Sequence, residues 1–126
     1  MVELEDRGTS IRHLDAQVAE RVFGYVNVQW CGDSPGDPDW YGEDPAFGLG
    51  RGLRIKPYST DWNAAAEVIE HLRDHGAGEL RLESHGWRWV ASFSGTGQPG
   101  ECGKTGPEAI CRAALAIADA RPCRRG

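Results

Sequence analysis

The sequence is short of the features that would place it in several well-known classes of protein. It has 4 cysteines in 126 residues, and no two of them have the two-to-four-residue spacing of a zinc knuckle. A chain of this length buries roughly two-thirds of its unfolded surface on folding, so it needs neither a metal nor a disulfide to be stable. We therefore expect reduced cysteines without a bound metal. The four positions are Cys31, Cys102, Cys111 and Cys123.

Long apolar runs and positive charge are also lacking. The longest apolar run, Ala113–Ala118, is far too short to span a bilayer, and the acidic start over residues 1–6 is unlike a secretory signal. Lysine and arginine number 14 against 19 aspartate and glutamate residues, which gives a net charge of -5. Nucleic acids and anionic membranes select basic proteins, so we expect neither as a general partner. These absences predict a soluble protein of the cell interior.

The sequence offers no recognisable catalytic or metal-binding constellation. Ser84 and His85 are neighbours on an expected hairpin, where adjacent side chains point to opposite faces and cannot share a hydrogen bond. His71 and His75 have the four-residue spacing of a metal pair on a helix, but no third ligand can be assigned. We favour a role for them at the helix C-terminus, where partial positive charge suits the helix dipole. We therefore predict no catalytic residue, no metal and no cofactor.

What is present is a regular exchange of helical and strand patterns, and the clearest helix covers residues 60–75. Pro57 keeps the residue before it out of the helical region, and Asp61 places negative charge at the positive end of the helix dipole. Ile69 lies in the middle of its apolar stripe, and Ile110 in that of the last helix, so we expect both in the core. Helices are expected near 10–23, 60–75 and 105–120, and strands near 25–31, 52–56, 79–84 and 87–94.

The expected elements follow the order α-β-β-α-β-β-α. Because the strands alternate cleanly between apolar and polar residues, we expect a mainly antiparallel sheet with one dry face. The predicted fold class is therefore α+β, with a four-stranded sheet packed with three helices as a sandwich. The length of 126 residues predicts a single domain with an ordered core over about 10–120.

Three blocks of sequence, Leu14–Gly24, Tyr58–Ala65 and Thr105–Leu115, together resemble the phage ABA-sandwich-domain family. His13 stands where the family usually has an acidic residue, and Gly106 stands where it usually has alanine; neither change threatens the fold. The resemblance implies helices packed on a sheet, in a small bacteriophage or prophage protein expressed in the cytoplasm of the bacterial host. It implies no reaction. Phage proteins of this class and size often bind a host protein or sequester a small signalling molecule.

The glycine-rich stretch Gly95–Thr105 nearly matches the phosphate-binding P-loop, Gly-x-x-x-x-Gly-Lys-Thr. That pattern requires glycine where the chain has Gln98, and only one helix and a tail follow, which leaves no later acidic strand for a metal. We therefore do not expect a P-loop nucleotide hydrolase. Thr105 with Glu108 three residues later instead predicts a capping box at the start of the last helix. The amides of that helix's first turn, together with Lys104, would still make an anion site.

The stretch 31–50 combines acidic residues, aromatic residues and three prolines, and a loop this long inside a compact domain is usually functional or disordered. The spacing of its acidic residues does not match an EF-hand calcium loop. Two interpretations remain open. Either Trp40, Tyr41 and Phe47 belong to a lid over a ligand or partner, or they cap the core from an ordered loop without a binding role.

The direction of the chain suggests where a ligand would bind. When the chain is followed along the expected helices and strands, the irregular stretches 31–52 and 94–104 meet at one end of the sheet. The turns 57–61 and 85–86 lie at the other end. Loops, exposed aromatics, a lysine and a positive helix end would suit an anionic, ring-bearing ligand, with the aromatics stacked on its ring. The predicted ligand-binding residues are Trp40, Tyr41, Gly103, Lys104 and Thr105.

We therefore expect a non-enzymatic phage accessory protein that binds a small anionic or nucleotide-like molecule, or a host protein, in a role that includes antagonising host defence. One alternative is a small hydrolase acting on a phosphorylated or nucleotide-like molecule. A further alternative is a structural or assembly component. Each of these functions is compatible with a homo-oligomer.

Overall fold

The computed structural model describes residues 11–31, 39–48, 50, 52–97 and 99–120. Residues 11–22 are helical, and their last turn, Val18–Val22 (η1), is a π-helix. The remaining elements are β1 (Val26–Cys31), β2 (Asp39–Glu43), β3 (Leu53–Arg54), α2 (Trp62–Asp74), β4 (Leu80–His85), β5 (Arg88–Phe93), β6 (Glu101–Gly103) and α3 (Gly106–Ala120).

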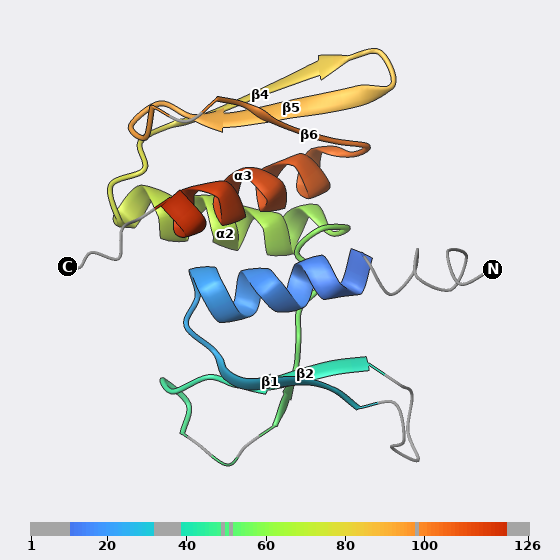
Figure 1. The fold of residues 1–126 in the computed structure, drawn as a ribbon, viewed down its shortest axis with the longest axis vertical. Coiled ribbons are helices and arrows are strands. Elements are labelled where there is room, and N and C mark those ends of the chain that lie inside the picture. The colour runs from blue at the N-terminus through green and yellow to red at the C-terminus, as the bar shows by residue number, and fades with distance from the viewer. Residues whose placement is uncertain (1–10, 32–38, 49, 51, 98, 121–126) are drawn as a thin grey trace.

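The strands form two antiparallel sheets of three strands each, in the orders β1-β2-β3 and β4-β5-β6. We call them the N-terminal sheet and the C-terminal sheet. Figure 1 shows the helices as a layer between the two sheets, with α3 against the C-terminal sheet and the first helix against the N-terminal sheet. The fold is therefore α+β, as predicted, but the prediction of one four-stranded sheet in the order α-β-β-α-β-β-α is wrong.

The error arose at two strands that carry little alternating pattern. β6 has only three residues and ends in a glycine, and β2 has a glycine in its middle. Gly42 is needed there because a Cβ atom at this position would lie 2.9 Å from Cγ2 of Val28 and 3.3 Å from Cδ1 of Ile55. The two strands fall within the stretches 31–52 and 94–104, which the sequence pattern alone describes as irregular.

The strongest local signals predicted the correct elements. Asp61 caps α2 by accepting a hydrogen bond from Asn63 N at 3.1 Å, and Gly76 follows the helix with a φ of 88°. The hairpin expected over residues 79–94 is confirmed, because β4 and β5 pair in register from Leu80–Phe93 to His85–Arg88.

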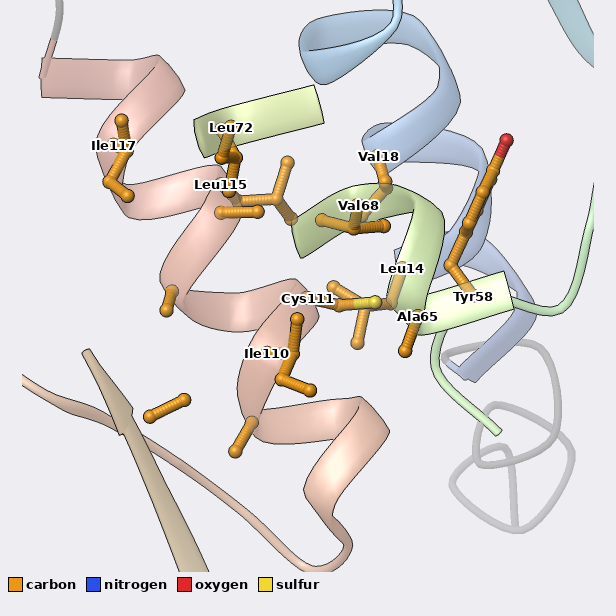
Figure 2. Close-up of a cluster of buried hydrophobic side chains, with 14 of the residues drawn as sticks. Leu14, Val18, Tyr58, Ala65, Val68, Leu72, Ile110, Cys111, Leu115 and Ile117 are labelled. Atoms are coloured by element: carbon orange, nitrogen blue, oxygen red, sulfur yellow. The ribbon is translucent and has the colours of Figure 1, made fainter. Parts of the chain in front are cut away.

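The core lies where α3 meets α2, the first helix and the C-terminal sheet, as Figure 2 shows for part of it. Ile110 is completely buried, as predicted, and so is Cys111. Ile69 is only partly buried, whereas its neighbour Val68 is completely buried, as is Ala65. The apolar stripe of α2 is thus rotated slightly from its expected position.

The N-terminal sheet is joined to the first helix by a network of charged groups. Asp15 is completely buried, and its carboxylate accepts hydrogen bonds from Nη1 of Arg12 and from Ser59 N, each at 2.6 Å. Arg12 also bonds Oδ1 of Asp39, at 2.9 Å from Nε. Asp39, at the start of β2, in turn accepts from Nε of Arg54 in β3 at 2.6 Å. The network therefore connects the helix to two strands of the N-terminal sheet.

The pKa values of the two carboxylates in this network are shifted in opposite directions. Desolvation by burial raises the pKa of Asp15 above its ordinary value of 3.8, although hydrogen bonds from Ser59 and Arg12 oppose the change. Burial also acts to raise the pKa of Asp39, but hydrogen bonds from Trp40 N, Arg12 and Arg54 outweigh it and lower the pKa. The more exposed carboxylate is thus the more acidic one.

Candidate functional site

The structure divides the predicted ligand-binding residues between the two sheets. Trp40 and Tyr41 lie in β2 of the N-terminal sheet, whereas Gly103 ends β6 of the C-terminal sheet. Lys104 and Thr105 connect β6 to α3. Since the helix layer separates the sheets (Figure 1), the structure does not bring the two groups together.

The added strand β6 also changes the end of the helix layer at which α3 begins. It crosses the C-terminal sheet once more than expected, so α3 begins at the end of the helix layer where α2 also begins (Figure 1). The indole of Trp62, the first residue of α2, lies against Gly106, the first residue of α3, and fills the space that a Cβ atom would need. The expected placement of the 57–61 turn at the end opposite to Lys104 is therefore wrong. A large neighbour at position 62 also accounts for glycine at position 106.

Trp40 packs against the core and the first helix. Its ring stacks on His13 with centroids 5.3 Å apart and meets the edge of Trp30 at 5.8 Å. Its Nε1 atom is buried and has no hydrogen-bond partner among the residues that the structure describes. Tyr41 pairs with Gln29 and Arg54 in the sheet. For Trp40 these contacts favour the interpretation in which the aromatic residues cap the core.

The other three predicted residues lie at an open groove of about 290 Å³ beside the edge strand of the C-terminal sheet. Gly103 and Lys104 line it, and Thr105 follows at the start of α3. We call this feature the basic groove. Its lining residues are Trp87, Arg88, Cys102, Gly103, Lys104, Glu108 and Arg112.

Three of the lining side chains are cationic and one is acidic. Arg112 is held by that acid, Glu108, with Nη2 to Oε2 at 2.9 Å. Arg88 lies over the ring of Trp87, 5.8 Å from its centroid, and makes a long contact of 3.8 Å with Sγ of Cys102. The ammonium group of Lys104 has no partner among the described residues. The groove thus has an excess of positive charge on a chain whose net charge is -5.

The Thr105 half of the capping box predicted at the start of α3 is present, and the Glu108 half is shifted by one residue to Lys104. Glu108 N donates to Oγ1 of Thr105 at 3.2 Å, and Oε1 of Glu108 accepts from Lys104 N at 3.3 Å. Ala109 N donates to Thr105 O at 3.0 Å, and Pro107 has no amide proton. The first-turn amides proposed for anion binding are therefore mostly occupied or absent. An anion in the groove would instead contact the cationic side chains.

Sequence reasoning found Lys104 and Gly103 through the glycine-rich motif but missed the other half of the groove. The pattern predicts Trp87 only as part of a hairpin strand, yet this residue is 81% exposed. A tryptophan directly after the turn glycine Gly86, with Arg88 next to it, was the signal in the sequence. The sequence analysis assigns no role to Arg112, and the position of Arg112 beside the groove follows from the packing of α3 on β6.

The remaining chemistry-bearing residues have structural contacts. Nδ1 of His75 bonds His71 O at 2.8 Å, and the two rings stack at 4.2 Å. No group of three potential metal ligands occurs within the described residues. Burial raises the pKa of the Cys111 thiol, and Cys31, Cys102 and Cys111 are free thiols. Cys123 lies outside the described residues. None of the described helices has the length and apolar character needed to cross a membrane.

Comparisons with known proteins agree with this fold. A family model described as the phage ABA sandwich domain matches residues 16–115. The crystal structure of a phage protein from Bacillus cereus ATCC 14579 is similar, with a TM-score of 0.56 and 21% sequence identity over 85% of this chain and 90% of that chain. At this identity the likeness concerns the fold alone. Comparison with curated proteins gave no match. The chain therefore belongs to the phage ABA sandwich domain family.

Proposed function

We propose that this phage-family protein binds a small anionic, nucleotide-like molecule in the basic groove and does not transform it. One observation carries the proposal. The Lys104 ammonium, which has no partner among the described residues, lies in one groove with the Arg88 guanidinium and the exposed ring of Trp87. Membership of the family supplies the phage context and leaves the ligand open.

The chemistry of these three side chains suits a phosphorylated ring. Lysine binds phosphate as a compact point charge and arginine binds it through a planar fork of donors. An exposed tryptophan offers a flat face, and stacking of a base on such a face contributes ~1–3 kcal/mol. The groove volume of about 290 Å³ is close to the lower limit for small-molecule sites, so a mononucleotide is a better fit than a larger ligand.

The surroundings of Glu108 favour binding over hydrolysis. A general base needs a carboxylate that can reach a water molecule beside the substrate. Glu108 is 7% exposed, and its two oxygens already accept bonds from Lys104 N and from the Arg112 guanidinium. It is the acidic residue that lines the groove. The hydrolase alternative would therefore require this cap to be broken during each turnover.

Thermal unfolding with AMP, ADP, adenosine and inorganic phosphate tests the proposal. A ligand that binds the folded state stabilises it by RT ln(1 + [L]/Kd), about 2.7 kcal/mol at a hundredfold excess over Kd. We expect the phosphorylated nucleotides to stabilise the protein more than adenosine or phosphate alone. Lys104→Glu and Trp87→Ala should each remove most of this effect. Recovery of the nucleotide unchanged by chromatography distinguishes binding from hydrolysis.

Lys56→Glu is the matched control, because this lysine is also exposed but pairs with Glu67 at 2.8 Å outside the groove. It should leave nucleotide stabilisation unchanged. If no nucleotide stabilises the wild-type protein, or if Lys104→Glu and Lys56→Glu respond alike, the groove is not a nucleotide site.

A host protein with an acidic surface is the second candidate, favoured by the 81% exposure of Trp87 beside Arg88. Tryptophan and arginine are the residues that most often dominate protein interfaces. A pull-down from infected bacteria with wild-type and Lys104→Glu baits tests it. A partner captured only by the wild type supports this candidate, and interference with host defence would then depend on that partner's identity. An assembly component would instead change its oligomeric state on size-exclusion chromatography.

A further inference from the structure

A second pocket, of about 540 Å³, lies between the N-terminal sheet and the helices and is independent of the basic groove. Four aromatic side chains line it: Phe23, Tyr25, Phe47 and Tyr58. We call it the aromatic pocket. Its volume is within the usual range for small-molecule sites, which are mostly apolar with a few fixed polar groups. None of its residues lines the basic groove.

One wall of the pocket is a stack of rings that the core holds in place. Phe23 and Tyr58 stack with centroids 5.1 Å apart and an angle of 20° between their planes. Tyr58 is 2% exposed, and Figure 2 shows its hydroxyl pointing away from the other core side chains. The Tyr25 hydroxyl interacts with that of Tyr58. This wall therefore combines flat apolar faces with phenolic hydrogen-bonding groups.

Phe47 is different because it is 68% exposed, yet it is not on a loose segment. It ends a tight turn that begins at Asp44, in which Phe47 N donates to Asp44 O at 2.9 Å. Oδ1 of Asp44 accepts from Ala46 N at 3.0 Å and fixes the same turn. The turn thus presents a large aromatic ring to solvent at the edge of a pocket, where a ligand could cover it.

The charges around the pocket cancel. Two cationic residues, Arg54 and Lys56, and two acidic residues, Asp44 and Glu67, line it. Lys56 pairs with Glu67 at 2.8 Å, and Arg54 pairs with Asp39 at 2.6 Å. A charged ligand would have to compete with these pairs, whereas a neutral ring would not. This balance contrasts with the excess of cations in the basic groove.

We propose that the aromatic pocket binds a neutral, planar heteroaromatic ring that carries a hydrogen-bond acceptor. The ring lies between Phe47 and the Phe23–Tyr58 stack, and its acceptor receives a hydrogen bond from the Tyr25 hydroxyl. Tyr58 is 2% exposed and its hydroxyl is paired with that of Tyr25, so the half-buried Tyr25 hydroxyl is the donor that reaches a ligand. This site goes beyond the anion-binding function proposed for the basic groove and does not depend on it.

Ligand-observed NMR with nicotinamide as the probe tests this inference, and cyclohexanecarboxamide serves as its non-aromatic match. The two probes have a similar size and the same amide, but only nicotinamide has a flat ring. We expect saturable binding of nicotinamide and at least about fivefold weaker binding of cyclohexanecarboxamide, because aromatic contacts of this kind are worth that ratio. Equal binding of the two probes, or no saturable binding of nicotinamide, overturns the proposal.

Variants locate the site. Phe47→Ala removes an exposed ring and should weaken nicotinamide about fivefold. Tyr25→Phe removes only a hydroxyl and should weaken it by a similar factor. Trp87→Ala, in the basic groove, is the matched aromatic control and should leave nicotinamide binding unchanged. A proton–nitrogen correlation spectrum of each variant verifies the fold. If the control weakens binding and Phe47→Ala does not, the ring binds in the basic groove and this inference is wrong.

Discussion

The C-terminal sheet packs on the helices through apolar side chains and through the backbone of a glycine, Gly103. The attachment of the N-terminal sheet to the helices also depends on charged groups. Ala91 and Phe93 of β5 are buried in the core, and a Cβ atom on Gly103 would lie 2.5 Å from Ala109 N of α3. On the other side of the layer, Arg12 joins the first helix to Asp39 of β2. One layer of helices therefore carries two sheets by different physical means.

The two kinds of contact contribute differently to the fold: apolar burial mainly stabilises it, and ion pairs mainly determine where a sheet is placed. Burial of apolar surface contributes ~25 cal/mol per Å² without regard to direction. A buried ion pair gains little over well-packed apolar residues, because desolvation offsets most of the attraction, but it requires one geometry. We infer that the C-terminal sheet supplies much of the stability, and that the network around Asp15 fixes where the N-terminal sheet sits.

The largest effect is expected from Arg12→Met. This change leaves the completely buried Asp15 without its cation, and an uncompensated buried charge costs ~3–5 kcal/mol. Urea unfolding measures the loss. Arg21→Met is the matched control, because Arg21 pairs with Asp119 where the two side chains are 45% and 56% exposed. Such a surface pair contributes ~0–1 kcal/mol. Equal losses in the two variants would contradict the importance of the buried network.

A second effect, on the apolar side, is expected from Ile110→Ala. Ile110 is completely buried between α3 and its neighbours, so its truncation should cost ~2–5 kcal/mol in urea unfolding. Ile69→Ala is the comparison, since Ile69 packs on the core but is only partly buried. It should cost clearly less. A loss below about 1 kcal/mol for Ile110→Ala would show that the core is elsewhere.

The smallest effect, and the sharpest contrast between the sheets, concerns pH. Because the folded-state pKa of Asp39 is lowered, its carboxylate stabilises the fold above its ordinary pKa of 3.8, and this contribution is lost as pH falls through the lowered value. Asp39→Asn should cost about 1.5 kcal/mol near neutral pH, and the difference from wild type should vanish in acid. Asp15 acts in the opposite sense because its folded-state pKa is raised. Its contribution to the stability of the fold falls as the pH rises from 3.8 through the raised value.

The cost of Ile110→Ala provides the reference for this pH series. It involves no titrating group, so it should stay constant while that of Asp39→Asn declines. Parallel pH profiles for the two variants would mean that the two sheets are held in the same way.

The separation along the chain between contacting residues decides which parts of the structure could be predicted from sequence. Helix α2, the β4–β5 hairpin and the Thr105–Glu108 capping box depend on residues close together in the chain. The bond between Arg12 and Asp39 joins residues 27 positions apart, and no local pattern in the sequence marks it. Local patterns therefore predicted two strands of each sheet, but neither β2 nor β6, nor the contact of Arg12 with Asp39.

The candidate site was predictable to the same extent. Lys104 lies in a recognisable glycine-rich motif, so the sequence led to one side of the basic groove. The sequence places Trp40 beside it because it predicts a single sheet, whereas the helix layer separates β2 from β6 (Figure 1). Phe47 was identified among the aromatic residues of its loop, but its pocket depends on Phe23 and Tyr58 from other parts of the chain. Those neighbours follow from tertiary packing, which no spacing in the sequence shows.

The π-helical turn η1 determines the direction, around the helix axis, in which Phe23 points toward the aromatic pocket. Phe23 N bonds Val18 O at 3.2 Å, five residues back, so this turn accommodates one residue more than a regular α-helical turn. Each residue advances an α-helix by about 100°, so deleting one residue here would swing Phe23 by roughly that angle about the axis. The ring would leave its place on Tyr58, while the Arg12–Asp15 half of the helix would stay in register. One extra residue thus allows a single helix to meet the charged network at one end and the aromatic pocket at the other.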